Sequence, residues 1–205
     1  MTVSPLLLAT RSEGKLRELR ELFGRAGIPV VDLEEVGLRP DPLEDDIEKG
    51  ATFEENAIAK ARYFFERLQR PVVADDSGLE VRALGNQPGV RSRRWSGRSD
   101  LVGQALDDAN NSRLLSELAR QADRGARYVC VATYVAGDME VSRRGETEGL
   151  ILEAPRGDQG FGYDPYFFSL ELGKTFGQAS GREKEAVSHR GRAFRELLAA
   201  LRHRR

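Results

Sequence analysis

The sequence predicts an α/β fold in which helices flank a mixed β-sheet, and three observations carry this prediction. Predicted strands and amphipathic helices alternate through the first half of the chain. The second half contains two long strands joined by the two-residue turn Gly137-Asp138, so we expect this hairpin-rich half to form a second lobe. A length of 205 residues, with 40% hydrophobic and 32% charged residues, is typical of a globular chain with a substantial core.

The first strands and the first helix follow each other closely. The apolar run Leu6–Ala9 is typical of a buried strand, and the helical spacing after it predicts a helix that ends near Gly24 and Gly27. Ile28–Asp32 predicts a second short strand. Glu34–Lys49 is acidic and contains prolines, so we expect a loop that reaches over a cleft.

Two longer helices are predicted next along the chain. Thr52, followed three residues later by Glu55, forms a capping box that starts a helix with apolar residues as far as Leu68. A further helix is expected over Leu101–Arg120. Its predicted inward-facing residues are Leu101, Ala105, Leu114, Leu115 and Leu118.

The second half predicts an antiparallel pair and a final helix. Tyr128–Ala136 and Met139–Glu148 are the paired strands, and Leu150–Leu152 extends the sheet. Tyr166–Phe168 predicts a short strand. Ser188 caps the last helix, and the tail Arg202–Arg205 is expected to be its solvated end, which complements the helix dipole.

Charge and composition exclude several classes of protein. The net charge is −1, so no global field recruits nucleic acid or an anionic membrane. The single cysteine, Cys130, lies in an apolar run and is expected to be a buried thiol. Met1–Leu8 lacks a basic region and is too short for a signal peptide, and no apolar stretch is long enough to span a membrane. We therefore expect a cytoplasmic location.

The most informative segment is Val72–Val81, in which an apolar strand leads into Asp75 and Asp76, a Ser-Gly turn and a second strand. Adjacent strand residues point to opposite faces, so one carboxylate is expected to face a cleft and the other to anchor its surroundings. A charge at the end of a buried strand is costly unless a cation or hydrogen bonds compensate it, and a metal ion would meet that need. The alternative is ordinary turn chemistry.

The segment Thr10–Lys15 lies between a buried strand and a helix N-terminus, where free N–H groups and the positive end of the dipole favour a phosphate. Lys15 adds a positive charge, although the spacing of a P-loop is missing. The alternative is a plain helix cap by Ser12 with an exposed lysine.

Two other segments carry polar groups that suit a ligand. In Gly160–Pro165 the glycines let the backbone approach a ligand and Phe161 offers a face for a base, or else the segment is a tight loop with a core aromatic. In Lys184–Arg190 the positive side chains of His189 and Arg190 oppose the dipole of the last helix, which favours a ligand acceptor over solvated surface charges.

Two further features leave alternatives open. Arg91–Arg98 holds four arginines around Trp95 and suits phosphates or stacked bases, a local anion site, or an arginine-rich interface between lobes. Glu48 could supply a second carboxylate to a divalent ion, or it is an exposed acid near a helix N-terminus.

Taken in order, these segments resemble the Ham1-like inosine triphosphate pyrophosphatases over residues 6 to 202. The motifs that carry the resemblance are Leu8-Ala9-Thr10-x-x-x-Gly14-Lys15, Thr52-Phe53-x-Glu55-Asn56-Ala57 with Lys60-Ala61, Ala74-Asp75-Asp76-Ser77-Gly78-Leu79, Pro88-Gly89-Val90, Gly160-Phe161-Gly162-Tyr163-Asp164-Pro165 and Ser188-His189-Arg190-Gly191.

The resemblance implies one Ham1-like domain over residues 1–205, made of two lobes of an elongated sheet with a nucleotide cleft between them. It implies a Mg²⁺-dependent enzyme that splits ITP, dITP and XTP into the monophosphate and pyrophosphate. It further implies a homodimer with no stable nucleic-acid partner and no membrane. The implied roles are Asp76 as catalytic acid and metal ligand, Glu48 as second metal ligand, and substrate contacts from Thr10, Arg11, Ser12, Glu13, Gly14, Lys15, Ser77, Phe161, Gly162, Tyr163, Asp164, Lys184, His189 and Arg190.

One departure from the family pattern concerns the phosphate segment. The family commonly has Thr-Gly-Asn where this chain has Thr10-Arg11-Ser12, and serine is shorter than asparagine. Whether Arg11 replaces the missing contact is left open by the sequence. Two rival functions also stay open: a Maf-like pyrophosphatase acting on other nucleotides, and a non-catalytic nucleotide- or RNA-binding module that uses Arg91–Arg98.

Overall fold

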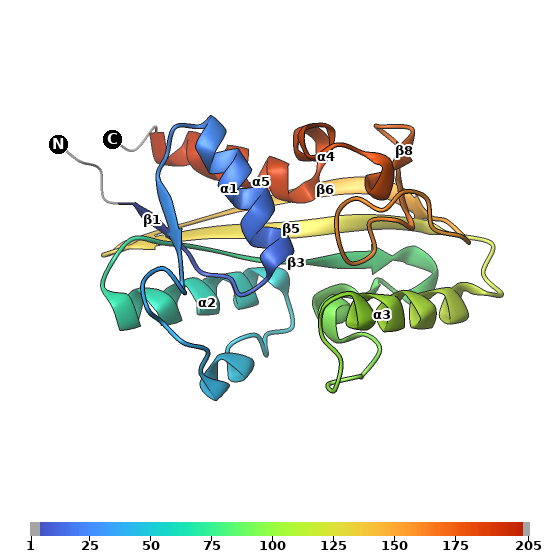
Figure 1. Cartoon of the computed structure of the whole chain (residues 1–205), viewed down its shortest axis with the longest axis horizontal. Coiled ribbons are helices and arrows are strands. Elements are labelled where there is room, and N and C mark those ends of the chain that lie inside the picture. Colours follow the sequence, from blue (N-terminus) through green and yellow to red (C-terminus); the bar gives the residue numbers. More distant parts are fainter. Residues whose placement is uncertain (1–4, 203–205) are drawn as a thin grey trace. The chain divides into compact units, whose positions relative to one another are not determined.

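The structure, a computed structural model, describes residues 5–202 and confirms an α/β fold with an open mixed sheet flanked by helices (Figure 1). The strands of the described chain are β1 (Leu6–Leu8), β2 (Val30–Asp32), β3 (Val72–Val81), β4 (Gln87–Pro88), β5 (Gly125–Ala136), β6 (Met139–Ile151), β7 (Phe167–Ser169) and β8 (Lys174–Thr175). The α-helices are α1 (Glu13–Arg25), α2 (Phe53–Leu68), α3 (Gly103–Leu118), α4 (Gly181–Val187) and α5 (His189–Arg202). Short 3₁₀-helices are η1 (Pro42–Asp46), η2 (Arg82–Leu84), η3 (Gly89–Arg94) and η4 (Phe176–Gln178).

The sheet is mixed because its two ends pair differently. The strand order is β2-β1-β3-β5-β6-β7-β8, with β4 paired to β3. β1 pairs in parallel with both β2 and β3, whereas β3–β4, β6–β7 and β7–β8 are antiparallel. The parallel strands are joined through helices, whereas β3–β4 and β7–β8 have short connections and β6–β7 is joined by the longer segment 152–166.

The chain divides into two compact units that do not follow its two halves. The first unit holds the described parts of Met1–Asp76 and Ala193–Arg205 together with Cys130–Arg144. The second holds Ser77–Val129 and Gly145–Arg192. The polypeptide therefore passes from one unit to the other four times, within β3, β5, β6 and α5. The prediction that the second half of the chain forms a lobe by itself is therefore wrong, because Cys130–Arg144 belongs to the first unit.

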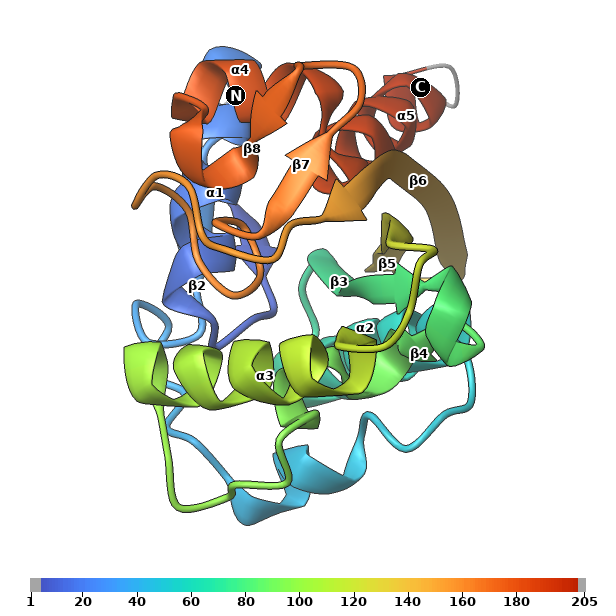
Figure 2. The same cartoon turned by 90° about the vertical axis from the view of Figure 1, so that its right-hand side faces the viewer.

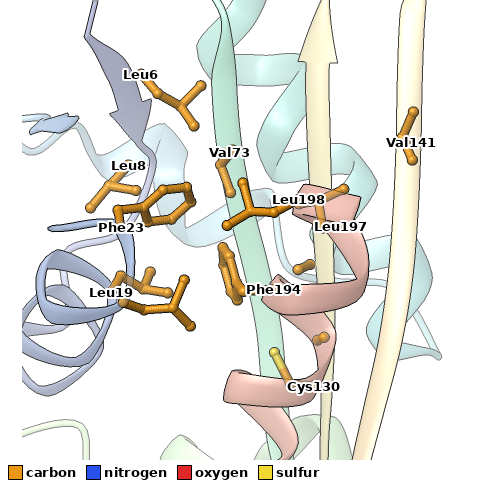
Figure 3. Packing of buried hydrophobic residues seen from close by; sticks show 13 residues of the cluster. Leu6, Leu8, Leu19, Phe23, Val73, Cys130, Val141, Phe194, Leu197 and Leu198 are labelled. Atoms are coloured by element: carbon orange, nitrogen blue, oxygen red, sulfur yellow. The ribbon is translucent and has the colours of Figure 1, made fainter. Parts of the chain in front are cut away.

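The core of the first unit lies on both faces of its strands. Figure 1 shows α1 and α5 on one face and α2 on the other. Figure 3 shows Phe23 of α1 and Phe194 of α5 close to Val73, and the two rings contact edge to face with centroids 5.8 Å apart. On the α2 face, Phe64 packs against Val72. Each such side chain contributes about 1.5–3 kcal/mol through burial.

The second unit has a core of its own, in which Figure 2 shows α3 and α4 on opposite sides of the strands. Leu114 and Leu118 of α3 pack with Phe167 of β7 and Phe176 of η4 in one buried cluster. Tyr128 lies in the same cluster, with its ring 4.6 Å from that of Phe167.

Some predicted elements differ from the structure. Val72–Val81 is one continuous strand with no Ser-Gly turn, because β3 lies inside the sheet between β1 and β5 and sheet pairing overrides the local turn preference. The third helix begins at Gly103, which leaves Ala105 exposed. The helix α4 and the strand β8 were not predicted. The proposed solvated tail lies outside the described residues except for Arg202.

Other predictions are confirmed. Thr52 and Glu55 form a capping box at the start of α2, and Ser188 accepts a hydrogen bond of 3.0 Å from the Gly191 N–H at the start of α5. Cys130 is fully buried. Within residues 5–202, none of the helices combines the length and the apolar character needed to cross a lipid bilayer.

Candidate functional site

β3 directs its two adjacent carboxylates to opposite faces. Asp75 lies on the same face as Val73, where it forms a 3.0 Å ion pair with Lys15 and accepts a 3.7 Å hydrogen bond from the Cys130 thiol. Asp76 lies on the α2 face and accepts a 2.9 Å hydrogen bond from Asn56 Nδ2. The predicted opposite orientation is confirmed: Asp75 is paired with Lys15, and Asp76 is held by Asn56.

The helix α2 supplies two buried polar side chains to the Asp76 side of the sheet. The capping box fixes the start of α2, which places Asn56 and Lys60 one turn apart on its buried face. Asn56 also accepts a 2.7 Å hydrogen bond from the Gly50 N–H, so its amide is held at both ends. Lys60 forms an ion pair with Glu48, which precedes the helix.

The charges of this group, here called the carboxylate cluster (Lys15, Glu48, Lys60, Asp75 and Asp76), perturb one another strongly. Burial raises the pKa of Asp76, although Lys15 and Lys60 act in the opposite direction. Burial also acts to raise the pKa of Glu48, but Lys60 and Lys15 outweigh it and the pKa is lowered. Lys60 has a raised pKa because three carboxylates outweigh its own desolvation. Asp76 is thus less compensated by positive charge than Glu48.

The donors of the carboxylate cluster fit a hard divalent cation. In the part of the chain that the structure describes, no set of three or more His, Cys, Asp or Glu residues is arranged to hold a metal alone. Asp76 and Glu48 offer oxygen ligands, and the raised pKa of Asp76 marks a carboxylate that a further cation would stabilise. A site of one or two carboxylates, completed by substrate phosphates and water, is typical of Mg²⁺.

The predicted phosphate segment follows β1 in the same unit. Thr10 is buried, and Ser12 caps α1, with its Oγ accepting from the Lys15 N–H at 3.4 Å and its own N–H donating to Thr10 Oγ1 at 3.2 Å. The Ser12 cap is therefore present, while Lys15 is not simply exposed because it reaches Asp75. Glu13 is exposed and Gly14 is half-buried in the first turn of α1.

The side chain of Arg11 bonds residues outside the predicted phosphate segment, Thr10–Lys15. Its guanidinium donates two hydrogen bonds to the Glu44 carboxylate, at 3.0 and 2.7 Å, and a third to the Leu38 carbonyl at 2.8 Å. These contacts lie 27 and 33 residues away in sequence, so the local pattern around Thr10-Arg11-Ser12 carried no sign of them.

The second unit gathers the remaining predicted residues into what we call the aromatic cluster (Phe161, Asp164, Lys184, His189 and Arg190). Asp164 Oδ2 accepts from the Phe161 N–H at 2.8 Å and from Lys184 Nζ at 2.6 Å. Lys184 Nζ and Arg190 Cζ lie 4.9 and 5.8 Å from the centre of the Phe161 ring. The Phe161 ring thus makes cation–π contacts with both Lys184 and Arg190.

The start of α5 orients His189 and Arg190. The His189 ring stacks on Tyr128 at 4.5 Å with an interplanar angle of 8°, and Arg190 Nη2 donates to Ser77 Oγ at 2.7 Å. Both side chains are 3% exposed, so the alternative of solvated surface charges is wrong.

Two predicted residues of the loop have structural partners. Tyr163 is buried and donates a 2.8 Å hydrogen bond to the Ser92 carbonyl, and burial raises the pKa of its hydroxyl. Gly162 is held by α3, since its N–H donates to Asp107 Oδ2 at 2.7 Å and its carbonyl accepts from Asn111 Nδ2 at 2.9 Å.

Sequence reasoning missed these supports for different reasons. Asn111 is buried on α3, whose inner face was predicted from its leucines alone. The signal that could have revealed it is the pair of adjacent asparagines, Asn110 and Asn111, within that helix. The helix α4, which supplies Lys184, starts with the capping box Ser180 and Glu183, a pattern visible in the sequence.

The tryptophan of the arginine-rich segment is not a stacking platform. Trp95 is only 4% exposed, its ring packs in the core of the second unit, and Arg113 covers it with Cζ 4.1 Å from the ring centre. The interpretation of Arg91–Arg98 as a surface that stacks bases on Trp95 is therefore wrong.

Comparison with known proteins gives one family. The sequence model described as the Ham1 family matches residues 6–200. A dITP/XTP pyrophosphatase of Mycobacterium tuberculosis (strain ATCC 25618 / H37Rv) is 48% identical over 202 residues, which cover 98% of this chain and 96% of that protein. A dITP/XTP pyrophosphatase of Frankia alni is 44% identical over 200 residues, covering 96% of each chain.

Solved structures agree with this result. The Staphylococcus aureus Ham1 protein superposes with a TM-score of 0.82 at 35% identity, over 98% of this chain and all (100%) of that one. A HAM1 protein from Coxiella burnetii has a TM-score of 0.82 at 33% identity, with coverage of 98% and 100%.

Proposed function

Because the chain belongs to the Ham1 family, we propose that it hydrolyses dITP, ITP and XTP to the nucleoside monophosphate and pyrophosphate. The relatives named for this activity are 44–48% identical over nearly the whole chain, which supports the substrate class. The observation that carries the chemistry is Asp76, a buried carboxylate with a raised pKa beside Lys15 and Lys60. Removal of these triphosphates would keep deaminated bases out of nucleic acid synthesis.

In the proposed reaction Asp76 takes the proton of the attacking water, for which a raised pKa is favourable. Lys15 and the N-terminus of α1 hold the phosphate oxygens, and Lys60 keeps Glu48 in place. A divalent ion held by Asp76 and Glu48 would neutralise charge on the triphosphate and polarise the water. Phosphoryl chemistry of this kind depends mainly on positioning and charge neutralisation, which these residues supply.

We further propose that the aromatic cluster binds the base. Phe161 offers its ring face for stacking, and His189 and Arg190 offer donors to the 6-keto oxygen of hypoxanthine and xanthine. Adenine has an amino group there, and a mismatched buried pair costs about 1–3 kcal/mol. Guanine shares the 6-keto group, so its rejection requires a pocket that excludes the 2-amino group while admitting the 2-keto group of xanthine.

The experiment is pyrophosphate release from a panel of nucleoside triphosphates, with Mg²⁺ and with chelator. We expect kcat/KM for dITP, ITP and XTP to exceed that for ATP and GTP by about 100-fold or more, and activity to vanish in chelator. Comparable turnover of ATP and ITP would refute the proposed substrate class. A preference for pyrimidine nucleotides would instead favour the Maf-like alternative.

The remaining parts of the proposal concern organisation. We propose that residues 1–205 act as a single domain made of the two units, as a homodimer in the cytoplasm. Light scattering coupled to size exclusion tests the dimer, and the mass of one chain, 22.8 kDa, would contradict it. A nucleic-acid-binding role is not favoured, because Trp95 is buried.

A further inference from the structure

One acidic segment of the first unit is attached to its surroundings by ion pairs at three points. We call residues 38–48, which include η1, the strap. Asp41 pairs with Arg67 of α2 at 2.9 Å, Glu44 pairs with Arg11 at 2.7 Å, and Glu48 pairs with Lys60. The strap thus connects the turn after β1 with the helix α2.

The short helix η1 and the turn after it link Glu44 to Glu48 in the strap. Asp41 caps η1 by accepting a 3.0 Å hydrogen bond from the Leu43 N–H, and the Ile47 N–H donates to the Glu44 carbonyl at 3.2 Å. The two glutamates are four residues apart across this turn. We therefore expect a displacement of Glu44 to move Glu48, one of the two carboxylates proposed to hold the metal.

Arg11 uses its guanidinium for the strap. Nε and Nη2 form a bidentate pair with Glu44, and Nη1 donates to the Leu38 carbonyl. The charge of Arg11 is neutralised by Glu44, so it adds little positive potential for a triphosphate. The side chains are 30% and 14% exposed, and a pair of that exposure contributes little to global stability.

We propose that Arg11 is a positioning residue: by holding the strap against the turn after β1, it keeps Glu48 beside Lys60 and Asp76. This inference rests on the proposed function for its effect on turnover, and on the geometry alone for its effect on the strap. It explains an arginine where a glycine is common in the family, without assigning the arginine to the phosphates.

The test compares Arg11→Ala, Glu44→Gln, the double variant and Arg11→Lys. The matched control is Arg62→Ala, because Arg62 forms a bidentate pair with Glu140 in the same unit, away from the strap. Two properties are measured: hydrogen–deuterium exchange of the strap amides without nucleotide, and kcat, KM and the Mg²⁺ concentration for half-maximal activity with dITP.

We expect Arg11→Ala and Glu44→Gln each to raise strap exchange and to lower kcat by about tenfold, with a higher Mg²⁺ requirement and an almost unchanged KM. The double variant should be no worse than Arg11→Ala alone, because both lose the pair with Glu44 and the hydrogen bond to the Leu38 carbonyl. Arg11→Lys should behave like Arg11→Ala, since an ammonium cannot form the bidentate pair. Arg62→Ala should match the wild type.

The opposite pattern would overturn the proposal. If Arg11 binds phosphate directly, Arg11→Ala raises KM, Arg11→Lys retains much of the activity, and Glu44→Gln leaves strap exchange unchanged. Failure of the proposed function looks different, because wild-type protein would then release no pyrophosphate from any non-canonical purine triphosphate. The exchange measurement would still decide whether Arg11 holds the strap.

Discussion

Lys184 Nζ lies 2.6 Å from Asp164 Oδ2, and both side chains are almost completely removed from solvent. The same carboxylate oxygen accepts the Phe161 N–H, so one aspartate fixes both the cation and the aromatic residue of the loop. The Asp164–Lys184 pair therefore holds the aromatic cluster together, and each of its two buried charges is neutralised by the other.

Asp164→Asn is expected to destabilise the protein by about 3–5 kcal/mol, because it leaves the Lys184 ammonium buried without its counter-charge. Urea denaturation measures the change. Glu183→Gln is the control, since it removes an ion pair of similar length, with Lys174, from the surface while keeping a capping side chain. A loss as small as that of Glu183→Gln would show that Lys184 does not need Asp164.

Asp76→Asn is expected to lower kcat for dITP by about 10²- to 10⁴-fold while nucleotide binding is retained. It should also raise the melting temperature near neutral pH. Burial raises the pKa of Asp76, so the folded state binds this proton more tightly, and the stability it contributes is lost as the pH rises through the folded pKa. Asparagine carries no charge and keeps an acceptor for Asn56.

The pH dependence separates these effects. The gain in melting temperature of Asp76→Asn over the wild type should shrink as the pH falls toward the ordinary aspartate value, where both proteins are neutral at this position. Thermal unfolding over a pH series provides the comparison. Wild-type turnover in the variant, or a gain in stability that grows toward acid pH, would contradict the role given to Asp76.

Gly160→Ala and Gly162→Ala form a matched pair in one loop. Both glycines have positive φ, +79° and +64°, so each substitution costs about 1–2 kcal/mol of backbone strain. At Gly160 a Cβ would also lie 2.0 Å from Asp164 Oδ2, whereas at Gly162 it would meet nothing within 4 Å. We expect Gly160→Ala to raise KM for dITP about tenfold more than Gly162→Ala. Equal KM values for the two variants would contradict the clash.

Asn111→Ala is expected to reduce the preference for ITP over ATP, measured as the ratio of their kcat/KM values. The amide of Asn111 holds the Gly162 carbonyl, so its loss frees the loop next to Phe161. Asn110→Ala is the control, because Asn110 is equally buried on α3 but bonds the backbone of Ser96 and Arg93 instead. The same loss of preference in both variants would indicate a general loosening of α3.

Local patterns were enough to predict the elements that are stabilised locally. The capping box of Thr52, the cap of Ser188 and the hairpin at Gly137-Asp138 all depend on residues a few positions apart. The prediction of a Ser-Gly turn was wrong because β3 is an interior strand, between β1 and β5, and remains extended through these residues. The helix α4 is only seven residues long, too short for a clear apolar period.

The site could be predicted only in its residue types. Strand alternation indicated that Asp75 and Asp76 have different roles, and the structure places them on opposite faces. The partners that tune them are distant in sequence: Lys15 is 60 residues from Asp75, and Arg11 is 33 residues from Glu44. Such pairs are set by tertiary packing, on which the local sequence carries no information.

Because the polypeptide crosses between the two units four times, the units cannot be separated at the level of the gene. Neither unit corresponds to one uninterrupted stretch of the gene, because the first requires pieces from the beginning, middle and end of the chain. A stop codon after residue 192 would delete Phe194 and Leu197 and so open a hydrophobic core that they share with Leu19, Phe23 and Val73. Neither unit can therefore be transferred to another protein as a single contiguous segment.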